Sequence, residues 1–322
     1  MTGRALVLGA GGFLGSHLCR RLLRSGWHVT GVVRDREDGH LKPRLQDLVG
    51  DLELVEGSAD DTSLLNRLVV GTDAIFPFAG RSGATASMAD PLADLAANGA
   101  SQLKVLEAVR RHAKEARLVF PGSRLQYGRP LTLPVTEEHP AAPRCVYGMH
   151  KALGEGYHLL YSRIYGVETC SLRISLPYGP WQDRADAAFG VVGTFLATAA
   201  RGGTIQLYGG GHQLRDYVFV EDLCELVEVA ATSPLAVGEV FNAGGPQATS
   251  IRDMAAAVIE TVSSGEIADV PWPPEAEAVE TGDWITSSEK AAQVLGWRPT
   301  TSLGQGLAVT WEALMPALET AR

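Results

Sequence analysis

Short apolar runs alternate with longer amphipathic stretches over the first third of the chain. The runs at residues 5–8, 29–33, 52–55, 74–76 and 118–120 predict buried β-strands. The stretches between them, including residues 17–24 and 92–112, have the periodicity of helices with one apolar face. Strands that alternate with helices are typical of βαβ units, so we expect a parallel sheet with helices on both faces.

The pattern changes after residue 120. A loop is predicted there by four prolines, Pro130, Pro134, Pro140 and Pro143. Helical periodicity then returns over residues 147–165, and beyond Pro177 the predicted elements are shorter and mixed. We therefore predict an α/β protein: a Rossmann-type doubly wound parallel sheet in residues 1–175 and a smaller mixed α/β lobe in residues 176–322. We expect the chain to cross between the two lobes more than once.

Composition narrows the class of protein. The 322 residues are 45% hydrophobic and 20% charged, with a net charge of -9 and no basic clusters, which argues against nucleic acid and membrane surfaces as partners. The first nine residues predict a strand and a glycine turn rather than a leader, so we expect a cytoplasmic protein. Four dispersed cysteines and eight scattered histidines show no zinc-type spacing, so we expect no metal site.

A glycine-rich turn follows the first predicted strand and opens the first predicted helix. Gly9, Gly12 and Gly15 have G-x-x-G-x-x-G spacing. Glycines at such a turn let the backbone approach a pyrophosphate, and the N-terminus of the helix offers N–H groups and a partial positive charge. The turn predicts a dinucleotide site.

The choice of dinucleotide depends on the end of the second predicted strand. Val33 occupies the position where a carboxylate that binds the ribose of NAD is expected, and Arg34 follows it. A guanidinium suits the 2′-phosphate of NADP, so NADP(H) is slightly favoured. NAD(H) is not excluded, because the carboxylate of Asp35 lies one position further along the chain.

A tyrosine and a lysine begin the helix after the proline loop. Tyr147 and Lys151 are four positions apart and so lie on one helix face. A cation within about 4–6 Å lowers a tyrosine pKa by roughly 1–3 units, which would prepare Tyr147 to exchange a proton with a substrate hydroxyl. Ser123 follows a predicted strand, where parallel-sheet enzymes keep active groups, and can bind the same oxygen.

These motifs together resemble those of the extended short-chain dehydrogenase/reductases, in particular the nucleotide-sugar epimerase/dehydratase group, over nearly the whole chain. Beside the glycine turn, the matching residues are Asn98, Ser123, Tyr127-Gly128, Tyr147, Lys151, Tyr178-Gly179-Pro180, Arg215-Asp216-Tyr217 and Leu295-Gly296-Trp297. The resemblance implies that Tyr147 is the general acid/base, that Lys151 binds the nicotinamide ribose, that Ser123 holds the reacting oxygen and that Arg215 meets the nucleotide diphosphate.

The resemblance also supplies two sets of binding residues. For the cofactor we expect Gly9, Gly12, Phe13, Leu14, Gly15, Arg34, Ser58, Ala59, Ala79, Gly80, Asn98, Tyr147 and Lys151. For a nucleotide-sugar substrate we expect Ser82, Ser123, Leu176, Gln206, Tyr208, Arg215 and Asp283. A homodimer that packs through the helices near Asn98 and Tyr147 is implied as well.

Several positions depart from the family pattern. Dehydratases of the family carry an Asp-Glu pair after the active serine or threonine, where this chain has Arg124-Leu125. Leu176 replaces an asparagine, Ser58 replaces an aspartate near the adenine, and Glu280 replaces an arginine before Gly282-Asp283, where an inward carboxylate would repel phosphate.

Three functions remain open. The first is an NAD(P)-dependent nucleotide-sugar 4-epimerase, which oxidises C4 transiently and returns the hydride. The second is an NADPH-dependent ketoreductase that acts on a 4-keto sugar. The third is a dinucleotide-sensing protein without catalysis, against which the intact Ser123, Tyr147 and Lys151 argue.

Overall fold

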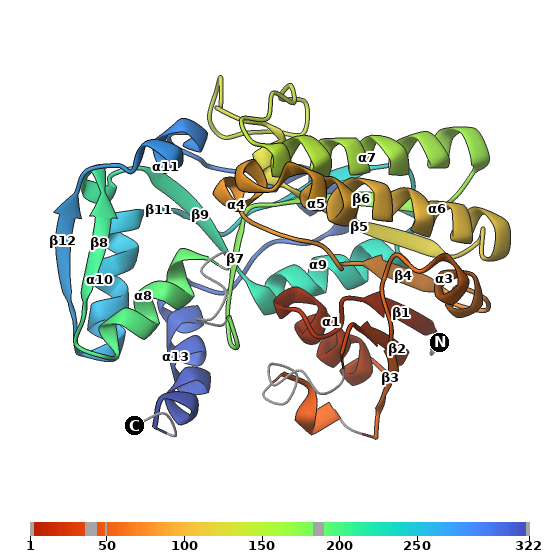
Figure 1. Ribbon diagram of the computed structural model, residues 1–322, viewed down its shortest axis with the longest axis horizontal. Coiled ribbons are helices and arrows are strands. Elements are labelled where there is room, and N and C mark those ends of the chain that lie inside the picture. The colour runs from red at the N-terminus through yellow and green to blue at the C-terminus, as the bar shows by residue number, and fades with distance from the viewer. Residues whose placement is uncertain (1–2, 36–43, 49, 183–189, 320–322) are drawn as a thin grey trace.

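The computed structural model describes residues 3–35, 44–48, 50–182 and 190–319. Its centre is a seven-stranded sheet in the order β10-β6-β5-β4-β1-β2-β3 (Figure 1). All of its strand pairs are parallel: β1 (Arg4–Leu8), β2 (His28–Val33), β3 (Leu52–Glu56), β4 (Ala74–Pro77), β5 (Arg117–Ser123), β6 (Thr169–Ile174) and β10 (Val240–Ala243). The predicted Rossmann-type sheet is confirmed, and its five predicted strands differ from the observed ones only at their ends.

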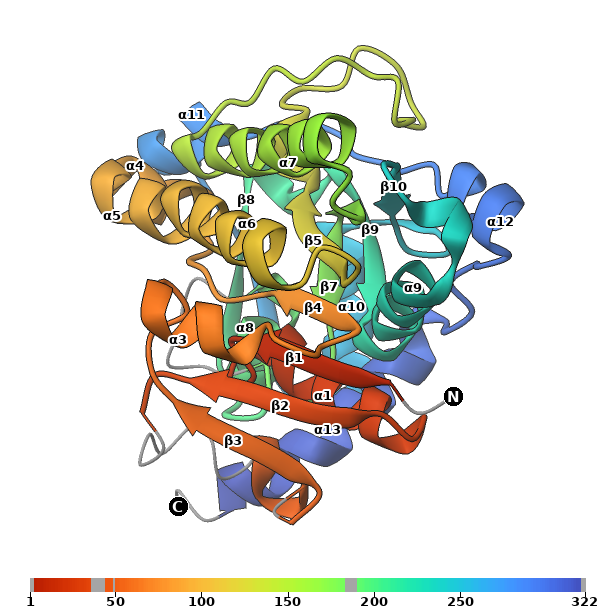
Figure 2. The same cartoon turned by 90° about the vertical axis from the view of Figure 1, so that its right-hand side faces the viewer.

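Helices cover both faces of this sheet (Figure 2). One face carries α1 (Phe13–Arg24) and α9 (Val220–Thr232), whose buried side chains share one apolar core with the strands. The other face carries α3 (Thr62–Leu68), α6 (Ser101–His112) and α7 (Val146–Tyr165), around a second core. Because both faces are buried, the strands are apolar almost throughout, and β5 is buried at all seven positions.

The predicted helix at residues 92–112 is interrupted. It consists of α5 (Pro91–Leu95), a π-helical turn (Ala96–Ala100) and α6, and α4 (Ala84–Ala89) precedes it. The π-turn contains Asn98, whose side chain bonds to the loop after β4. A π-turn re-aims the side chains of a helix and is frequent at functional sites, which an amphipathic pattern alone does not reveal.

The smaller lobe has a core of its own and two short sheets. Its elements are β7 (Leu176–Tyr178), α8 (Val191–Ala199), β8 (Thr204–Tyr208), β9 (Leu214–Phe219), β11 (Ala248–Ser250), α10 (Ile251–Val262), β12 (Glu266–Val270), α11 (Pro274–Val279) and α13 (Leu303–Glu319), and α12 (Glu289–Leu295) packs near β10. One sheet has the order β11-β9-β7 and contains parallel and antiparallel pairs, and the other pairs β12 with β8.

The chain passes between the two lobes. It leaves the central sheet at Ser175, between β6 and β7, and returns to it through α9 and β10. The division at residues 175 and 176 stays a prediction, although β10 shows that the second half also contributes to the large sheet.

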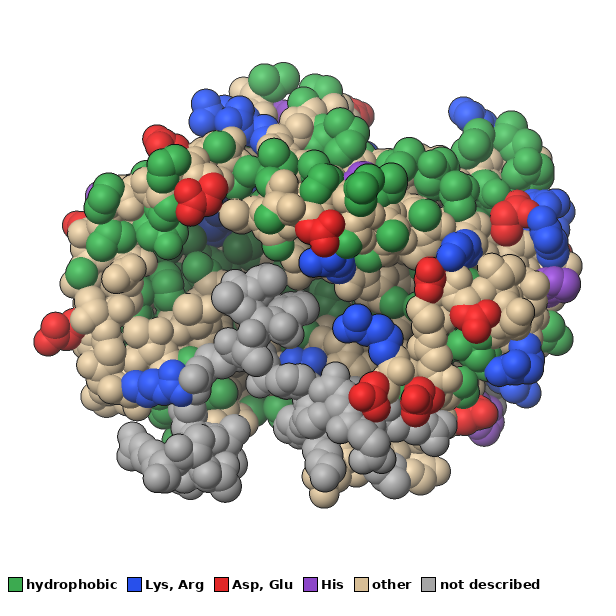
Figure 3. Space-filling model, viewed as in Figure 1, with side chains coloured by type: hydrophobic (Ala, Val, Ile, Leu, Met, Phe, Trp, Pro, Cys, Tyr) green, Lys and Arg blue, Asp and Glu red, His purple; other side chains and the backbone are tan. Residues whose placement is uncertain are grey.

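Two surface features concern the predicted partners. Among the described residues, no helix is both long enough and apolar enough to span a membrane. Apolar side chains are exposed along α5 and α7, where Figure 3 shows a band of hydrophobic groups. They are Leu92, Leu95, Met149, Leu153, Leu160, Ile164 and Tyr165.

Candidate active site

The glycine turn lies between β1 and α1. Gly9 has φ +86°, and a Cβ there would lie 2.7 Å from the backbone nitrogen of Ala79. A Cβ on Gly15 would lie 2.1 Å from the carbonyl oxygen of Gly9. Gly12 is the N-cap of α1 and has no side chain that could cap an N–H group, so the N-terminus of this helix is open to a ligand. The turn therefore has the shape that the sequence predicts for a pyrophosphate site.

Asn98 holds the loop after β4 against this turn. Its Oδ1 accepts a hydrogen bond from the backbone N–H of Arg81 (3.3 Å), and its Nδ2 donates to the carbonyl of Arg81 (3.0 Å) and to Asp94 (3.1 Å). Asn98 is 1% exposed, and a Cβ on Gly80 would lie 2.5 Å from its Oδ1. Asn98 thus acts on the site through the loop backbone, which passes the cavity.

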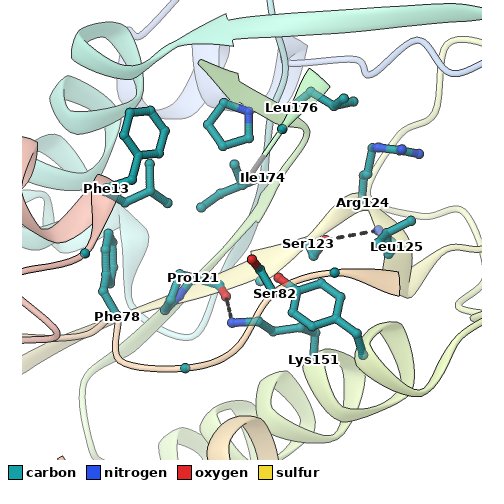
Figure 4. A pocket seen from close by; sticks show the side chains of 18 of the residues that line it. Phe13, Phe78, Ser82, Pro121, Ser123, Arg124, Leu125, Lys151, Ile174 and Leu176 are labelled. Carbon is teal, nitrogen blue, oxygen red and sulfur yellow. Dashed lines mark hydrogen bonds between the residues drawn. The ribbon is translucent and has the colours of Figure 1, made fainter. Parts of the chain in front are cut away.

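Ser123 and Lys151 come together where β5 ends and α7 begins (Figure 4), and Tyr147, also on α7, lines the same cavity. Ser123 and Tyr147 both line the cavity, and the side chain of Ser123 accepts the N–H of Leu125 at 3.2 Å. The Nζ of Lys151 donates to the carbonyl of Pro121 at 2.8 Å and lies 5.7 Å from the centre of the Tyr147 ring. The three predicted catalytic residues therefore line the same cavity.

Burial controls the charges of this trio. It raises the pKa of Tyr147 above its usual range, and the neighbouring Ser123 hydroxyl offsets only part of this effect. Burial also lowers the pKa of Lys151 to about 8, against the opposing charge of Asp94. In the protein alone, the pKa of Tyr147 thus shifts in the direction opposite to the predicted one, because burial of the phenol is the largest effect on it.

A cavity of about 350 Å³ joins the glycine turn to this trio. The predicted residues that line it are Gly12, Phe13, Leu14, Gly15, Gly80, Ser82, Ser123, Tyr147, Lys151 and Leu176. The hydroxyl of Ser82 is buried beside Ser123 with no hydrogen-bond partner among the described residues (Figure 4). An unsatisfied hydroxyl inside a cavity is suited to a polar ligand.

Other predicted cofactor residues lie outside the cavity, although near its glycine end. Arg34, Ser58 and Ala79 follow β2, β3 and β4, at the same carboxyl edge of the sheet as Gly9. Arg34 is exposed, and Ser58 bonds to Asp60. Ala59 neighbours Ser58, and Asn98 acts through the loop backbone.

Four predicted substrate residues are likewise not among those that line the cavity: Gln206, Tyr208, Arg215 and Asp283. The ring of Tyr208 packs near that of Trp272, and Asp283 accepts the N–H of Leu214 at 2.9 Å. Gln206 is exposed on β8.

Arg215 is held in an ion pair. Its Nη2 lies 2.5 Å from Glu280, and its Nη1 donates to the carbonyls of Leu214 and Gly282 at 2.7 Å each. Glu280 also accepts the N–H groups of Thr281 and Gly282. The carboxylate that could have repelled phosphate therefore neutralises the arginine that was expected to bind it, since the two side chains meet between β9 and the segment after α11.

Several cavity residues are absent from the predicted site. Phe78 and Arg81 follow β4, Ser175 follows β6, and Arg124 follows Ser123. Their common signal is their place after a parallel strand, the position where ligands bind in such sheets. Arg124 was noted in the sequence only as a departure from the dehydratase pattern.

The comparisons with known proteins agree with this geometry. The model of a family described as the NAD dependent epimerase/dehydratase family matches residues 5–244. The chain belongs to this family. Its predicted resemblance to nucleotide-sugar epimerases and dehydratases is thereby confirmed.

Individual members of the family are similar along the whole chain. A UDP-glucose 4-epimerase of Mycolicibacterium smegmatis is 32% identical over 314 residues, 96% of this chain and 97% of that protein. A crystal structure of UDP-glucose 4-epimerase from Thermotoga maritima with UDP-glucose has a TM-score of 0.88 and 27% identity, and covers 98% of this chain and 99% of the other. A UDP-glucose 4-epimerase from Thermus thermophilus in complex with NAD has a TM-score of 0.86, 27% identity and the same coverage.

The site of this family member fits a dinucleotide. The space beside Gly15 and Gly9 would be closed by a Cβ, and the open N-terminus of α1 lies on the cavity wall. Phe13, Leu14, Phe78 and Lys151 line the path from this turn to Ser123 (Figure 4).

Proposed function

We propose that this protein is a nucleotide-sugar 4-epimerase, which oxidises C4 of the sugar transiently and returns the hydride to either face of the keto sugar. The observation that carries the proposal is the convergence of Ser123, Tyr147 and Lys151 in the cavity whose wall contains the glycine turn. The similarity to UDP-glucose 4-epimerases along 96% of the chain supports it.

The side chains divide the work at C4 between them. Ser123 holds the carbinol oxygen, Tyr147 takes its proton and later gives it back, and Lys151 binds the nicotinamide ribose. The bound dinucleotide supplies the hydride acceptor and a positive charge. Because burial raises the pKa of Tyr147, the phenol is protonated at neutral pH in the protein alone, so proton transfer depends on positive charge placed near its oxygen.

Dehydration is disfavoured by the residues after Ser123. Elimination across C5–C6 needs an additional acid and base, and the cavity has Arg124 and Leu125 at these positions. The alternative is a one-way NADPH-dependent ketoreductase, which two observations favour: Leu176 lines the cavity in place of a polar residue, and Glu280 neutralises Arg215.

The identity of the dinucleotide is part of the proposal. Arg34 is exposed at the end of β2 and Asp35 follows it. The family description names NAD, and the similar structure from Thermus thermophilus contains NAD, so the predicted preference for NADP(H) has no support from these relatives. Calorimetric titration of the apoprotein with each dinucleotide decides between them, and Arg34→Ala should weaken NADP binding alone if the arginine meets a 2′-phosphate.

A homodimer is proposed through α5 and α7. Leu92 is 77% exposed, Leu160 41% and Ile164 60%, and further apolar side chains are exposed along α7. Such a surface is typical of an isologous interface. Light scattering at micromolar concentration should give twice the chain mass, and Leu160→Asp should give the monomer mass. A wild-type monomer would contradict the dimer.

A cytoplasmic location also stays a prediction. All four cysteines are buried and free, which is compatible with a reducing compartment.

The reaction can be tested by mass spectrometry. Molecules released on denaturation of the purified protein are identified first, and the protein is then incubated with UDP-, dTDP-, CDP- and GDP-sugars. Retained dinucleotide and an isomerised sugar of unchanged mass would support the epimerase. An empty protein that consumes NADPH with a 4-keto sugar would mean the ketoreductase, and inertness in both assays would favour a binding protein.

A further inference from the structure

The described part of the cavity wall is cationic. Arg81, Arg124 and Lys151 line it, and none of the described lining residues is an aspartate or glutamate. Lys151 donates to the carbonyl of Pro121 on the side near the glycine turn, and Arg81 pairs with Asp90 at 3.2 Å. Arg124 is therefore the lining arginine whose charge is left for a ligand.

Arg124 lies on the substrate side of the catalytic trio. It directly follows Ser123, and Figure 4 shows it with Leu176 on the opposite side of Ser123 from Phe13 and Phe78. Its Nη1 donates to the hydroxyl of Thr281 at 3.1 Å, and its guanidinium carbon lies 5.4 Å from the centre of the Trp284 ring. These contacts fix the guanidinium and use one of its five N–H donors.

The neighbouring carboxylates are engaged elsewhere. Glu280 is bound by Arg215 and by two backbone N–H groups. Asp216 accepts hydrogen bonds from Ser175 and from the N–H of Thr286. Neither carboxylate lines the cavity, and neither forms an ion pair with Arg124 among the described residues.

The charge of Arg124 is poorly compensated as a result. Burial and the nearby charge of Arg215 lower the pKa of Arg124 to about 10, although the charges of Asp216 and Glu280 act in the other direction. A bound anion would stabilise the charged form of such an arginine. The planar guanidinium can donate two parallel hydrogen bonds to phosphate or carboxylate oxygens.

We propose that Arg124, and not Arg215, binds the anionic oxygens of the substrate in this cavity. This inference rests on the proposed function, which places the sugar against Ser123 and Tyr147. The anion is either the diphosphate that every nucleotide sugar carries at C1, across the sugar ring from C4, or a carboxylate on C5, which is adjacent to a C4 atom held at Ser123. The proposal replaces the role that the family resemblance assigns to Arg215.

Calorimetric binding with UDP-glucose and UDP-glucuronate tests this inference. The variants are Arg124→Gln, which removes the charge and keeps an amide, and Arg124→Lys, which keeps the charge and removes the fork. Arg129→Gln is the matched control, because Arg129 is exposed in the same loop and does not line the cavity. Thermal unfolding checks that each variant is folded, and epimerisation by the wild type is measured in parallel.

We expect Arg124→Gln to weaken binding about 10- to 100-fold, Arg124→Lys less, and Arg129→Gln not at all. An equal loss for both ligands identifies the diphosphate, and a loss for UDP-glucuronate alone identifies the ring carboxylate. Unchanged binding of both ligands to a folded Arg124→Gln protein overturns the inference while leaving the function intact. A folded wild type that neither binds nor converts a nucleotide sugar overturns the proposed function and the inference with it.

Discussion

The two ends of the cavity are built in different ways. At the dinucleotide end, the backbone makes the site: Gly9 and Gly15 shape the turn, and Asn98 fixes the loop after β4 through main-chain hydrogen bonds. At the substrate end, long charged side chains dominate: Arg124 in the wall reaches across to Thr281 of the smaller lobe, and Arg215, outside the wall, pairs with Glu280 within that lobe.

This difference explains which of the predicted site residues line the cavity and which do not. A glycine that avoids a clash within its own turn can be recognised from spacing alone, because its reason lies within a few residues. Arg215 and Glu280 are 65 positions apart, and no local pattern shows that they will neutralise each other. Motif spacing therefore describes the dinucleotide end well and describes the substrate end poorly.

The largest expected effect is a loss of turnover, and it comes from Tyr147, which lies where the two ends of the cavity meet. Tyr147→Phe removes the proton donor and acceptor, so we expect turnover to fall about 10²- to 10⁴-fold with dinucleotide binding retained. Tyr165→Phe is the control, because Tyr165 lies at the exposed end of α7. Steady-state rates and a dinucleotide titration measure both properties, and unchanged turnover in Tyr147→Phe would remove Tyr147 from the catalytic assignment.

The second-largest expected effect is a loss of dinucleotide affinity, at the dinucleotide end of the cavity. Gly15→Ala places a Cβ 2.1 Å from the carbonyl of Gly9, so the turn must shift, and we expect dinucleotide affinity to fall by about 100-fold. Gly304→Ala meets no atom within 4 Å and should bind normally. Calorimetry on variants with native circular dichroism gives the comparison. Normal affinity in Gly15→Ala would mean that backbone shape does not define this end.

A smaller effect is expected from the ion pair at the substrate end. Glu280→Gln leaves the buried guanidinium of Arg215 without its carboxylate, and we expect a loss of about 2–3 kcal/mol in the free energy of unfolding. Glu289→Gln is the control, because its ion pair with Arg298 is half exposed. Urea unfolding measures both. A Glu280→Gln protein as stable as the control would show that Arg215 is not committed to this pair.

The smallest effect is the pH dependence of stability, which comes from the Rossmann side. Burial lowers the pKa of His17 to about 4 and that of His158 to about 3. The unfolded chain binds protons near pH 6.5 and the folded chain does not, so stability is present above pH 6.5 and falls as pH drops toward 4. We expect each of the two histidines to contribute a loss of about 1–2 kcal/mol between pH 6.5 and 5 by urea unfolding, and His158→Phe should remove one of the two contributions. Equal slopes in both proteins would exclude His158 as a cause.

Much of the fold could be predicted from the sequence. The five N-terminal strands and α7 follow from apolar runs and periodicity, because buried parallel strands and a long helix have strong local patterns. The π-turn at Asn98 could not be predicted, since it depends on hydrogen bonds to a loop that lies 17 positions earlier in the chain.

The candidate site, like the fold, could be predicted only in part from the sequence. Ser123, Tyr147, Lys151 and the glycine turn line one cavity, as their motifs indicate. Tyr208 and Asp283 do not, because they contact Trp272 and the backbone of Leu214 instead. The pKa of Tyr147 could not be predicted from the spacing of a cation either, since burial of the phenol outweighs it.

The central claim is that hydride leaves C4 and returns to C4 of the same sugar. Incubation of the protein with a UDP-hexose deuterated at C4, followed by mass spectrometry and NMR of the products, tests it most directly. The account predicts an epimerised sugar that keeps its deuterium at C4, with no net change in added dinucleotide. Deuterium found in solvent or in free reduced dinucleotide, or no epimerised sugar from any member of the substrate panel, would contradict it.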